Sequence, residues 1–185
     1  MSIFDLQIET DRLLLRPPRA EDFEAWAVFQ ADEQAARYIG GVQSRPVAWR
    51  SFATVSGAWH LQGFGFFSAI EKATGEWVGR LGPWQPEGWP GTKVGWSIAR
   101  PHWGRGFAPE GAAAAMDWAF DGLGWSEVIH SINKENASSK AVARKLGSGF
   151  MRMAWLPAPH DSEPVEIWGQ SRAQWRSSRS AKGVT

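Results

Sequence analysis

The spacing of apolar residues predicts a chain that alternates between short strands and amphipathic helices. Trp49, Phe52, Ser56 and Trp59 recur at intervals of three and four, which is typical of one face of a helix. Runs rich in β-branched and aromatic residues, bounded by Gly and Pro, predict strands. The predicted strands are 12–16, 64–70, 76–81, 93–99, 127–132, 149–155 and 165–170. The predicted helices begin near residues 20, 44, 109 and 136.

Capping residues and breakers set the ends of these elements. Ser44 before Arg45-Pro46 is a helix start, and Gly63 is the matching stop. Residues 82–91, rich in Pro, Gly and Trp, predict a loop between two strands. Residues 93–132 read as a strand–helix–strand unit. The whole pattern predicts a mixed α/β (α+β) fold.

We interpret residues 1–175 as one domain and 176–185 as a basic, frayed tail. The 185 residues carry 20 Lys and Arg against 19 Asp and Glu, a net charge of +1 that argues against nucleic-acid binding. The absence of cysteine excludes thiol nucleophiles and disulfides. Because the sequence also lacks a signal peptide and a membrane-length apolar run, we expect a cytoplasmic protein with no membrane partner.

A glycine-rich bend between a strand and a helix is the first sign of chemistry. Gly104 and Gly106 flank Arg105 just before the helix that begins near residue 109. The free amides at such a helix start can bind a phosphate or diphosphate, and an arginine can add a charged contact. A plain strand-to-helix turn would use the same glycines. The dinucleotide-binding and P-loop patterns both fail, for lack of a third glycine and of a Gly-Lys-Ser/Thr ending.

Several ordered motifs make the sequence resemble the GNAT acyltransferase superfamily, in the branch of the ribosomal-protein N-terminal (RimJ/RimL-type) acetyltransferases. One matching segment is Trp103-Gly104-Arg105-Gly106-Phe107-Ala108-Pro109-Glu110-Gly111-Ala112, in which Trp103 and Pro109 depart from the usual family residues. Further matches lie at residues 9–16, 20–22, 71–79, 94–98, 117–120, 133–139 and 145–147. The resemblance covers nearly the whole chain up to residue 170.

The resemblance implies a mostly antiparallel sheet of about seven strands with about four helices, splayed between the strands at 93–99 and 127–132. It implies acetyl-CoA as co-substrate, with pantetheine in the splay and diphosphate on the glycine bend. The implied cofactor-binding residues are Ser97, Ile98, Ala99, Gly104, Arg105, Gly106, Phe107, Ala108, Asn136 and Ser139. For Asn136, helix capping is an alternative role that is compatible with cofactor contact.

The sequence departs from the family pattern at its acid–base groups. Lys93 stands where the family often has a glutamate base, and the usual late tyrosine is absent because Tyr38 is the only tyrosine. Our catalytic candidates are Ser139, Glu71 and His130, with His102 and Glu166 as further candidate bases. Each of these bases could equally be an ordinary structural residue. The histidines lack metal-binding spacing, so we expect no metal.

The aromatic residues suggest where the acceptor binds. We expect Tyr38, Trp84, Trp89 and Trp96 to line the acceptor pocket, although a tryptophan can equally pack in the core.

The leading hypothesis is an acetyl-CoA-dependent N-acetyltransferase that acts on a small-molecule or peptide amine by direct attack. The alternatives are a non-catalytic acyl-CoA sensor of the same fold and an interaction module using exposed tryptophans. The thirteen tryptophans would also suit a homodimer interface.

Overall fold

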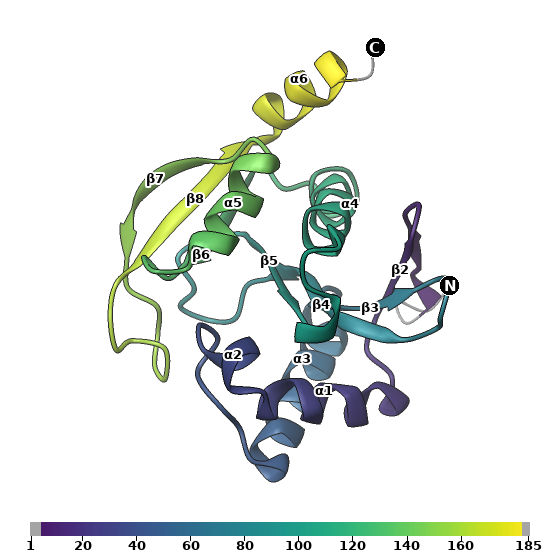
Figure 1. Ribbon diagram of the computed structural model, residues 1–185. Coiled ribbons are helices and arrows are strands. Elements are labelled where there is room, and N and C mark those ends of the chain that lie inside the picture. The colour runs from purple at the N-terminus through teal and green to yellow at the C-terminus, as the bar shows by residue number, and fades with distance from the viewer. Residues whose placement is uncertain (1–4, 183–185) are drawn as a thin grey trace.

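A single eight-stranded sheet organises the computed structural model, which describes residues 5–182 (Figure 1). The strand order is β1-β2-β3-β4-β5-β6-β8-β7. The strands are β1 (Ile8–Glu9), β2 (Leu13–Arg16), β3 (Phe67–Glu71), β4 (Trp77–Trp84), β5 (Lys93–Ile98), β6 (Glu127–Ile132), β7 (Gly149–Ala154) and β8 (Val165–Ser171). All neighbouring strands are antiparallel except β5 and β6, which are parallel.

Helices cover both faces of this sheet. They are α1 (Phe23–Ala31), α2 (Glu33–Ala36), α3 (Arg45–Gln62), α4 (Phe107–Asp121), α5 (Ala137–Lys145) and α6 (Arg172–Lys182). The connection β5–α4–β6 is the predicted strand–helix–strand unit. Helix α3 begins after Ser44 and stops before the left-handed Gly63, as predicted, although the Ser44 side chain makes no capping hydrogen bond.

The sheet divides where β5 meets β6. Only one backbone pair, Lys93 with Ile129, joins these two strands, whereas β4 and β5 pair over six residues and β6 and β8 over six. Beyond that pair the group β6, β8 and β7 diverges from β5, as Figure 1 shows. The mixed fold and the splay implied by the resemblance are therefore confirmed.

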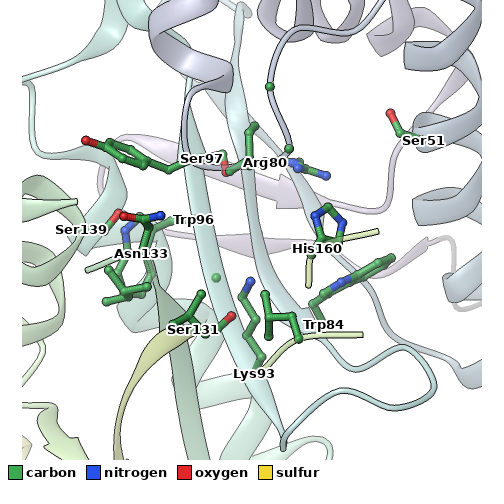
Figure 2. A pocket seen from close by; sticks show the side chains of 18 of the residues that line it. Ser51, Arg80, Trp84, Lys93, Trp96, Ser97, Ser131, Asn133, Ser139 and His160 are labelled. Carbon is green, nitrogen blue, oxygen red and sulfur yellow. The ribbon is translucent and has the colours of Figure 1, made fainter. Parts of the chain in front are cut away.

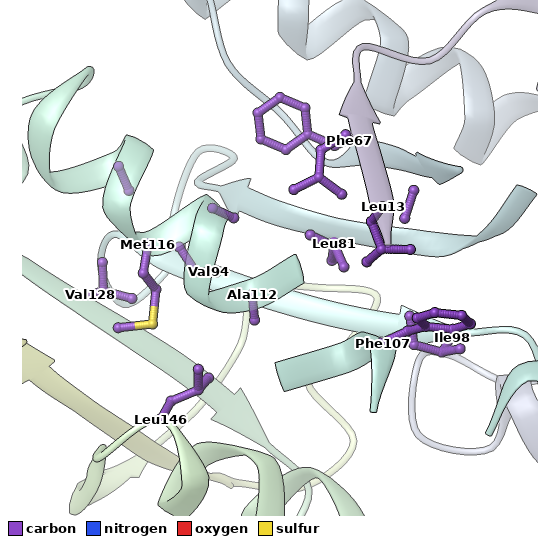
Figure 3. Packing of buried hydrophobic residues seen from close by; sticks show 14 of the residues in the cluster. Leu13, Phe67, Leu81, Val94, Ile98, Phe107, Ala112, Met116, Val128 and Leu146 are labelled. Atoms are coloured by element: carbon purple, nitrogen blue, oxygen red, sulfur yellow. The ribbon is translucent and has the colours of Figure 1, made fainter. Parts of the chain in front are cut away.

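Two apolar clusters fix the helices against the sheet. On one face, Phe107 and Met116 of α4 pack against Leu13, Leu81 and Val94 (Figure 3). On the other face, aromatic residues of α1 and α3 enclose Phe66 and Trp77, including Trp26, Phe29 and Phe52. Burial of such side chains contributes about 1.5–3 kcal/mol each. The core therefore holds β4 and β5 from both sides and leaves the opening between β5 and β6.

The structure differs from the predicted elements in four places. Strand β4 continues to Trp84 through part of the expected 82–91 loop, because residues 79–84 all pair with β5. Strand β1 and helix α2 were not predicted, and their short lengths of two and four residues explain why the sequence pattern missed them. Residues 172–182 form α6, where a frayed tail was expected from 176 onward. The rest of that tail, 183–185, lies outside the described residues.

A buried ion pair ties β2 to the first helical turn and to β3. Both oxygens of Asp22 accept hydrogen bonds from Arg16, each at 2.8 Å, and Asp22 also accepts from the Arg19 amide and the Ser68 hydroxyl. Burial acts to raise the pKa of Asp22, but the hydrogen bonds from Arg16, Arg19 and Ser68 outweigh it and lower the pKa. The ionised carboxylate therefore stabilises the fold.

We expect Asp22→Asn to lower the free energy of unfolding by about 3 kcal/mol at pH 7, since it leaves the buried Arg16 charge with only the exposed Glu21, at 3.4 Å, as an anionic partner. Because the folded pKa is lowered, this contribution is present above the ordinary pKa of 3.8 and is lost as pH falls further. Urea unfolding at pH 7 and near pH 3 measures both effects. A difference that stays constant with pH would contradict the assignment.

Candidate active site between β5 and β6

A cavity of about 810 Å³ opens where β5 separates from β6. Its walls come from the 37–43 segment, α3, β4, β5, β6 and the 156–163 segment (Figure 2). Tyr38, Trp84, Trp89 and Trp96, the four residues expected in an acceptor pocket, all line it. The tertiary structure thus brings these four side chains to one cavity, although their contact with an acceptor stays a prediction.

The edge of β5 that faces the cavity carries free backbone groups. The carbonyls of Thr92 and Val94 face β6, because they accept from Ile129 and His130, whereas the Ala99 amide faces β4 and donates to Val78. Since backbone groups alternate along a strand, Trp96 and Ile98 present their amides toward the opening.

Of Ser97, Ile98 and Ala99, the three strand residues predicted to bind the cofactor, only Ile98 has its amide directed to the opening. The Ala99 amide is already bonded across to β4, and the Ser97 backbone faces the same way. The Trp96 amide faces the opening instead. Backbone groups alternate along a strand, so this residue could have been predicted if the side of β5 that bonds to β4 had been known.

His130 acts as a bridge across the opening. Its Nδ1 lies 2.7 Å from the Val94 carbonyl and its Nε2 lies 2.9 Å from the Ser148 hydroxyl. Since the carbonyl can only accept, Nδ1 carries the proton and Ser148 donates to Nε2. Gln170 in turn donates to Ser148 at 2.9 Å, which completes a chain of donors from β8 to β5.

This bridge corrects the expectation that His130 serves as a catalytic base. The side chain is 1% exposed, and both ring nitrogens are engaged. Burial lowers the pKa of His130 to about 4; the Val94 hydrogen bond opposes this shift, and nearby Lys93 adds to it. The imidazole is therefore neutral and its lone pair is occupied, so it positions β5 relative to β6.

Glu71, the second predicted base, also serves another purpose. It lies on β3 outside the cavity lining and forms an ion pair with Arg105, whose guanidinium holds the pKa of Glu71 below its ordinary value. This pair fixes the glycine bend to β3. The Arg105 side chain remains 45% exposed in this pair, so its predicted contact with phosphate stays a prediction. Of the further candidates, Glu166 accepts from Lys140 and Trp168, while His102 contacts Arg105.

Carboxylate oxygens of Glu71 and Glu76 lie within 4.8 Å of a nitrogen of His102 and of each other, a grouping that could hold a metal ion. The Glu71 carboxylate, however, already forms an ion pair with Arg105. The sequence expectation of no metal stays a prediction.

The glycine bend has the form of an anion cradle. Gly104 and Gly106 adopt left-handed φ angles of 74° and 82°, which favour glycine. A Cβ on Gly104 would meet no atom within 4 Å, so the approach to the backbone is open there. Phe107 and Ala108 begin α4, and their amides have no acceptor within the helix. These residues fit the diphosphate of coenzyme A.

Asn136 and Ser139 lie at the opposite wall of the cavity, at the start of α5. The Asn136 side chain accepts from the Ser139 amide at 3.0 Å, so it caps helix α5. Capping was one of the two roles predicted for Asn136, and the other, contact with the cofactor, stays a prediction. Capping fixes the Ser139 side chain at the cavity, where Figure 2 shows it beside Trp96 and Asn133.

Arg80 and Lys93 line the same cavity, and neither was expected from the sequence to bind a ligand. Burial lowers the pKa of Lys93 to about 7, and the Arg80 charge adds to this effect. Burial also lowers the pKa of Arg80 to about 10. The one sequence signal for Arg80 was a charge in the otherwise apolar strand β4.

Comparison with known proteins places these features in a family. Residues 12–148 match the family model described as an acetyltransferase (GNAT) domain. The protein YkkB of Bacillus subtilis is 34% identical over 92 residues, which is 49% of this chain and 54% of that protein, so the match spans about half of YkkB. The N-acetyltransferase p20 of Bacillus licheniformis is 28% identical over 74% of this chain and 79% of its own length.

Solved structures share the whole architecture. An acetyltransferase from Agrobacterium tumefaciens is 29% identical with a TM-score of 0.80, over 90% of this chain and 95% of that one. RimJ of Mycobacterium smegmatis, solved with CoA-disulfide, has a TM-score of 0.69 at 17% identity, over 92% of this chain and 89% of its own. At that identity RimJ shows the shared fold alone.

The cradle can be tested with a charge at Gly106. We expect Gly106→Asp to weaken binding of coenzyme A by about tenfold or more relative to Gly106→Asn, since a carboxylate would lie beside the diphosphate. Asn and Asp both tolerate left-handed φ angles and have similar shapes, so Asn is the matched control. Isothermal titration measures the two affinities. Equal affinities would contradict the assignment.

The cost of burying Lys93 can be tested with pH. The unfolded chain binds one proton more than the folded chain between about pH 7 and 10.5, so stability rises with pH there. We expect Lys93→Met to be more stable than the wild type at pH 7, with a gap that closes at up to about 1.4 kcal/mol per pH unit. Urea unfolding across this range measures the gap, and exposed Lys145→Met is the control. Parallel curves would contradict the prediction.

Proposed function

Because the chain belongs to the GNAT acetyltransferase family, and is therefore an acyltransferase, we propose that it acetylates a primary amine by direct transfer from acetyl-CoA. The observation that carries the proposal is the single cavity that joins the free β5 edge, Ser139 and the aromatic walls. In our proposal the thioester enters along the β5 edge from the glycine bend, and the amine occupies the cavity beside it.

Acetyl-CoA supplies an acetyl group activated as a thioester. In our proposal the amides of the glycine bend bind its diphosphate, and the amides of Trp96 and Ile98 donate to the pantetheine arm and the thioester carbonyl. Trp103 stabilises this strand end, because its indole donates to the Ile98 carbonyl at 2.7 Å. The chain thus orients the thioester through the main chain.

The acceptor attacks the carbonyl as a neutral amine, and orientation in a ternary complex supplies much of the rate. Glu71 and His130 are both engaged elsewhere, so we assign neither as base. Among the described residues that line the cavity, Glu163 is the one carboxylate, and it accepts from Asn133 at 2.7 Å. We therefore propose that the amine loses its proton to solvent.

Ser139 is our candidate for the group that assists departure of the thiolate. Its amide is held by Asn136, and its side chain lies on the cavity wall. A hydroxyl there can donate a hydrogen bond to the sulfur as the carbon–sulfur bond breaks. The structural neighbour RimJ was solved with CoA-disulfide, which supports a coenzyme A site on this fold.

Other expectations from the sequence stay predictions: a cytoplasmic location, a homodimer, and acceptors that include peptide N-termini. Within residues 5–182, no helix combines the length and the apolar character that a membrane span requires.

Thiol release with acetyl-CoA and a panel of primary amines tests the function. We expect Ser139→Ala to lower kcat by about 10- to 100-fold with little change in the KM for acetyl-CoA. Ser138→Ala is the matched control, because this neighbouring serine is exposed and points to Asn136. Release that is absent with every amine, despite tight binding of coenzyme A, would favour the non-catalytic sensor.

A further inference from the structure

Two cations in the cavity have no anionic partner. Neither the Arg80 nor the Lys93 side chain makes a hydrogen bond or ion pair with any residue in the described range 5–182, and the buried Nε of Arg80 has no acceptor. Thirteen other Lys and Arg side chains in that range do form ion pairs. A pair of unpaired charges in one partly enclosed cavity is therefore unusual for this chain.

Aromatic rings hold both cations in place. The Arg80 guanidinium lies 4.7 Å from the Trp26 ring and 5.0 Å from the Phe66 ring. The Lys93 ammonium lies 6.0 Å from the same Phe66 ring and 5.1 Å from Trp89. The two charges thus share one ring, which keeps them close together and restricts their motion.

The backbone also makes room for this arrangement. A Cβ on Gly95 would lie 2.8 Å from Cε of Lys93 and 3.2 Å from Phe66. The missing Cβ therefore lets the lysine stem lie over β5 and directs its ammonium into the cavity. Figure 2 shows Lys93 pointing to the region of Arg80 and His160, with Ser139 on the other side.

The protein itself does not neutralise these charges. The carboxylate of Glu163, which lines the cavity, pairs with Lys134 and accepts from Asn133. Arg37, another cation of the lining, is exposed and pairs with Glu135. Burial of unpaired like charges destabilises a fold, so a ligand anion is the group that would offset this cost. Departures from the usual pairing of buried polar groups occur mainly at functional sites.

Arg80 and Lys93 also lie only a few residues along the sheet from the backbone groups that we propose bind the thioester. Arg80 is directly opposite Ser97 in the β4–β5 register, one residue from the free edges of Trp96 and Ile98. The cavity extends from there to Asn136 and Ser139. A small molecule that reaches Arg80 with one end can therefore present its other end at the thioester.

We propose that Arg80 and Lys93 form a binding site for an acidic group of the acceptor, so that the substrate is a small primary amine that also carries a carboxylate or phosphate. This inference rests on the proposed N-acetyltransferase function and specifies its substrate class. A guanidinium can form two parallel hydrogen bonds to either anion, and the adjacent ammonium adds a point charge. Polyamines and other acceptors with extra positive charge are disfavoured, because the two cations repel them.

Matched pairs of acceptors test the substrate class. We expect glycine, β-alanine or γ-aminobutyrate to be acetylated with a kcat/KM at least about 30-fold above that of the corresponding amide, which lacks the charge. Phosphoethanolamine compared with ethanolamine is the phosphate arm, and a larger ratio in one arm identifies which anion the site takes. Peptides and putrescine complete the panel.

Variants test the residues. We expect Arg80→Gln to reduce kcat/KM for the preferred acidic acceptor by about 30-fold or more and to bring the ratio of acid to amide near one. Lys93→Met should act in the same direction with a smaller effect. Arg50→Gln, which removes an exposed charge of α3 outside the cavity, is the control and should keep the wild-type ratio. Coenzyme A affinity and the melting temperature should not fall in either cavity variant, since an unpaired cation is removed.

Direct binding separates this inference from the proposed function. Isothermal titration of the same acids and amides into the protein saturated with coenzyme A gives affinities that do not depend on turnover. Binding of an acid that Arg80→Gln abolishes supports the anion site even if no amine is acetylated, in which case the proposed function fails alone. Equal binding of acids and amides, or acid binding that Arg80→Gln leaves intact, overturns the anion site and leaves the proposed function standing.

Discussion

The single backbone pair between Lys93 and Ile129 is the constraint on which the rest of the structure depends. If β5 and β6 paired along their whole length, the amides of Trp96 and Ile98 would be consumed by the sheet and no cavity would exist. The His130 bridge keeps the two strands joined at one end, because it connects the Val94 carbonyl to Ser148 and Gln170. One backbone pair and one side-chain bridge therefore fix the end of the opening where β5 and β6 meet.

Buried charges in this fold contribute to stability in one place and reduce it in another. The buried carboxylate of Asp22 is satisfied by four donors and strengthens the fold. Arg80 and Lys93, which line the cavity, have only aromatic rings as partners. An unpaired charge weakens the folded state but increases the electrostatic attraction of an incoming anion, since little water screens it. The two kinds of buried charge therefore mark scaffold and binding site.

The catalytic candidates drawn from residue type were the weakest part of the sequence interpretation. A glutamate and a histidine on strands are plausible bases by residue type, but Glu71 is held by Arg105 and His130 is held by Val94 and Ser148. Which partner a titratable side chain meets depends on residues distant in sequence, 34 positions away for Glu71 and 36 for His130. Local pattern carries no information about such partners. The left-handed glycines and the start of α4 were predictable, since glycine and helix-start signals are local, whereas their contact with a diphosphate stays a prediction.

The sequence by itself determined the order of most elements, the caps of α3, the glycine bend before α4 and the family resemblance, because each depends on residues a few positions apart. It also supplied Tyr38, Trp84, Trp89 and Trp96, four of the aromatic residues that line the cavity. Only the tertiary structure decided that β4 continues to Trp84, that the Trp96 backbone replaces Ser97 and Ala99 at the open edge, and that Arg80 and Lys93 share the Phe66 ring. Strand register and cross-strand neighbours fix these features, and both arise from packing between distant segments.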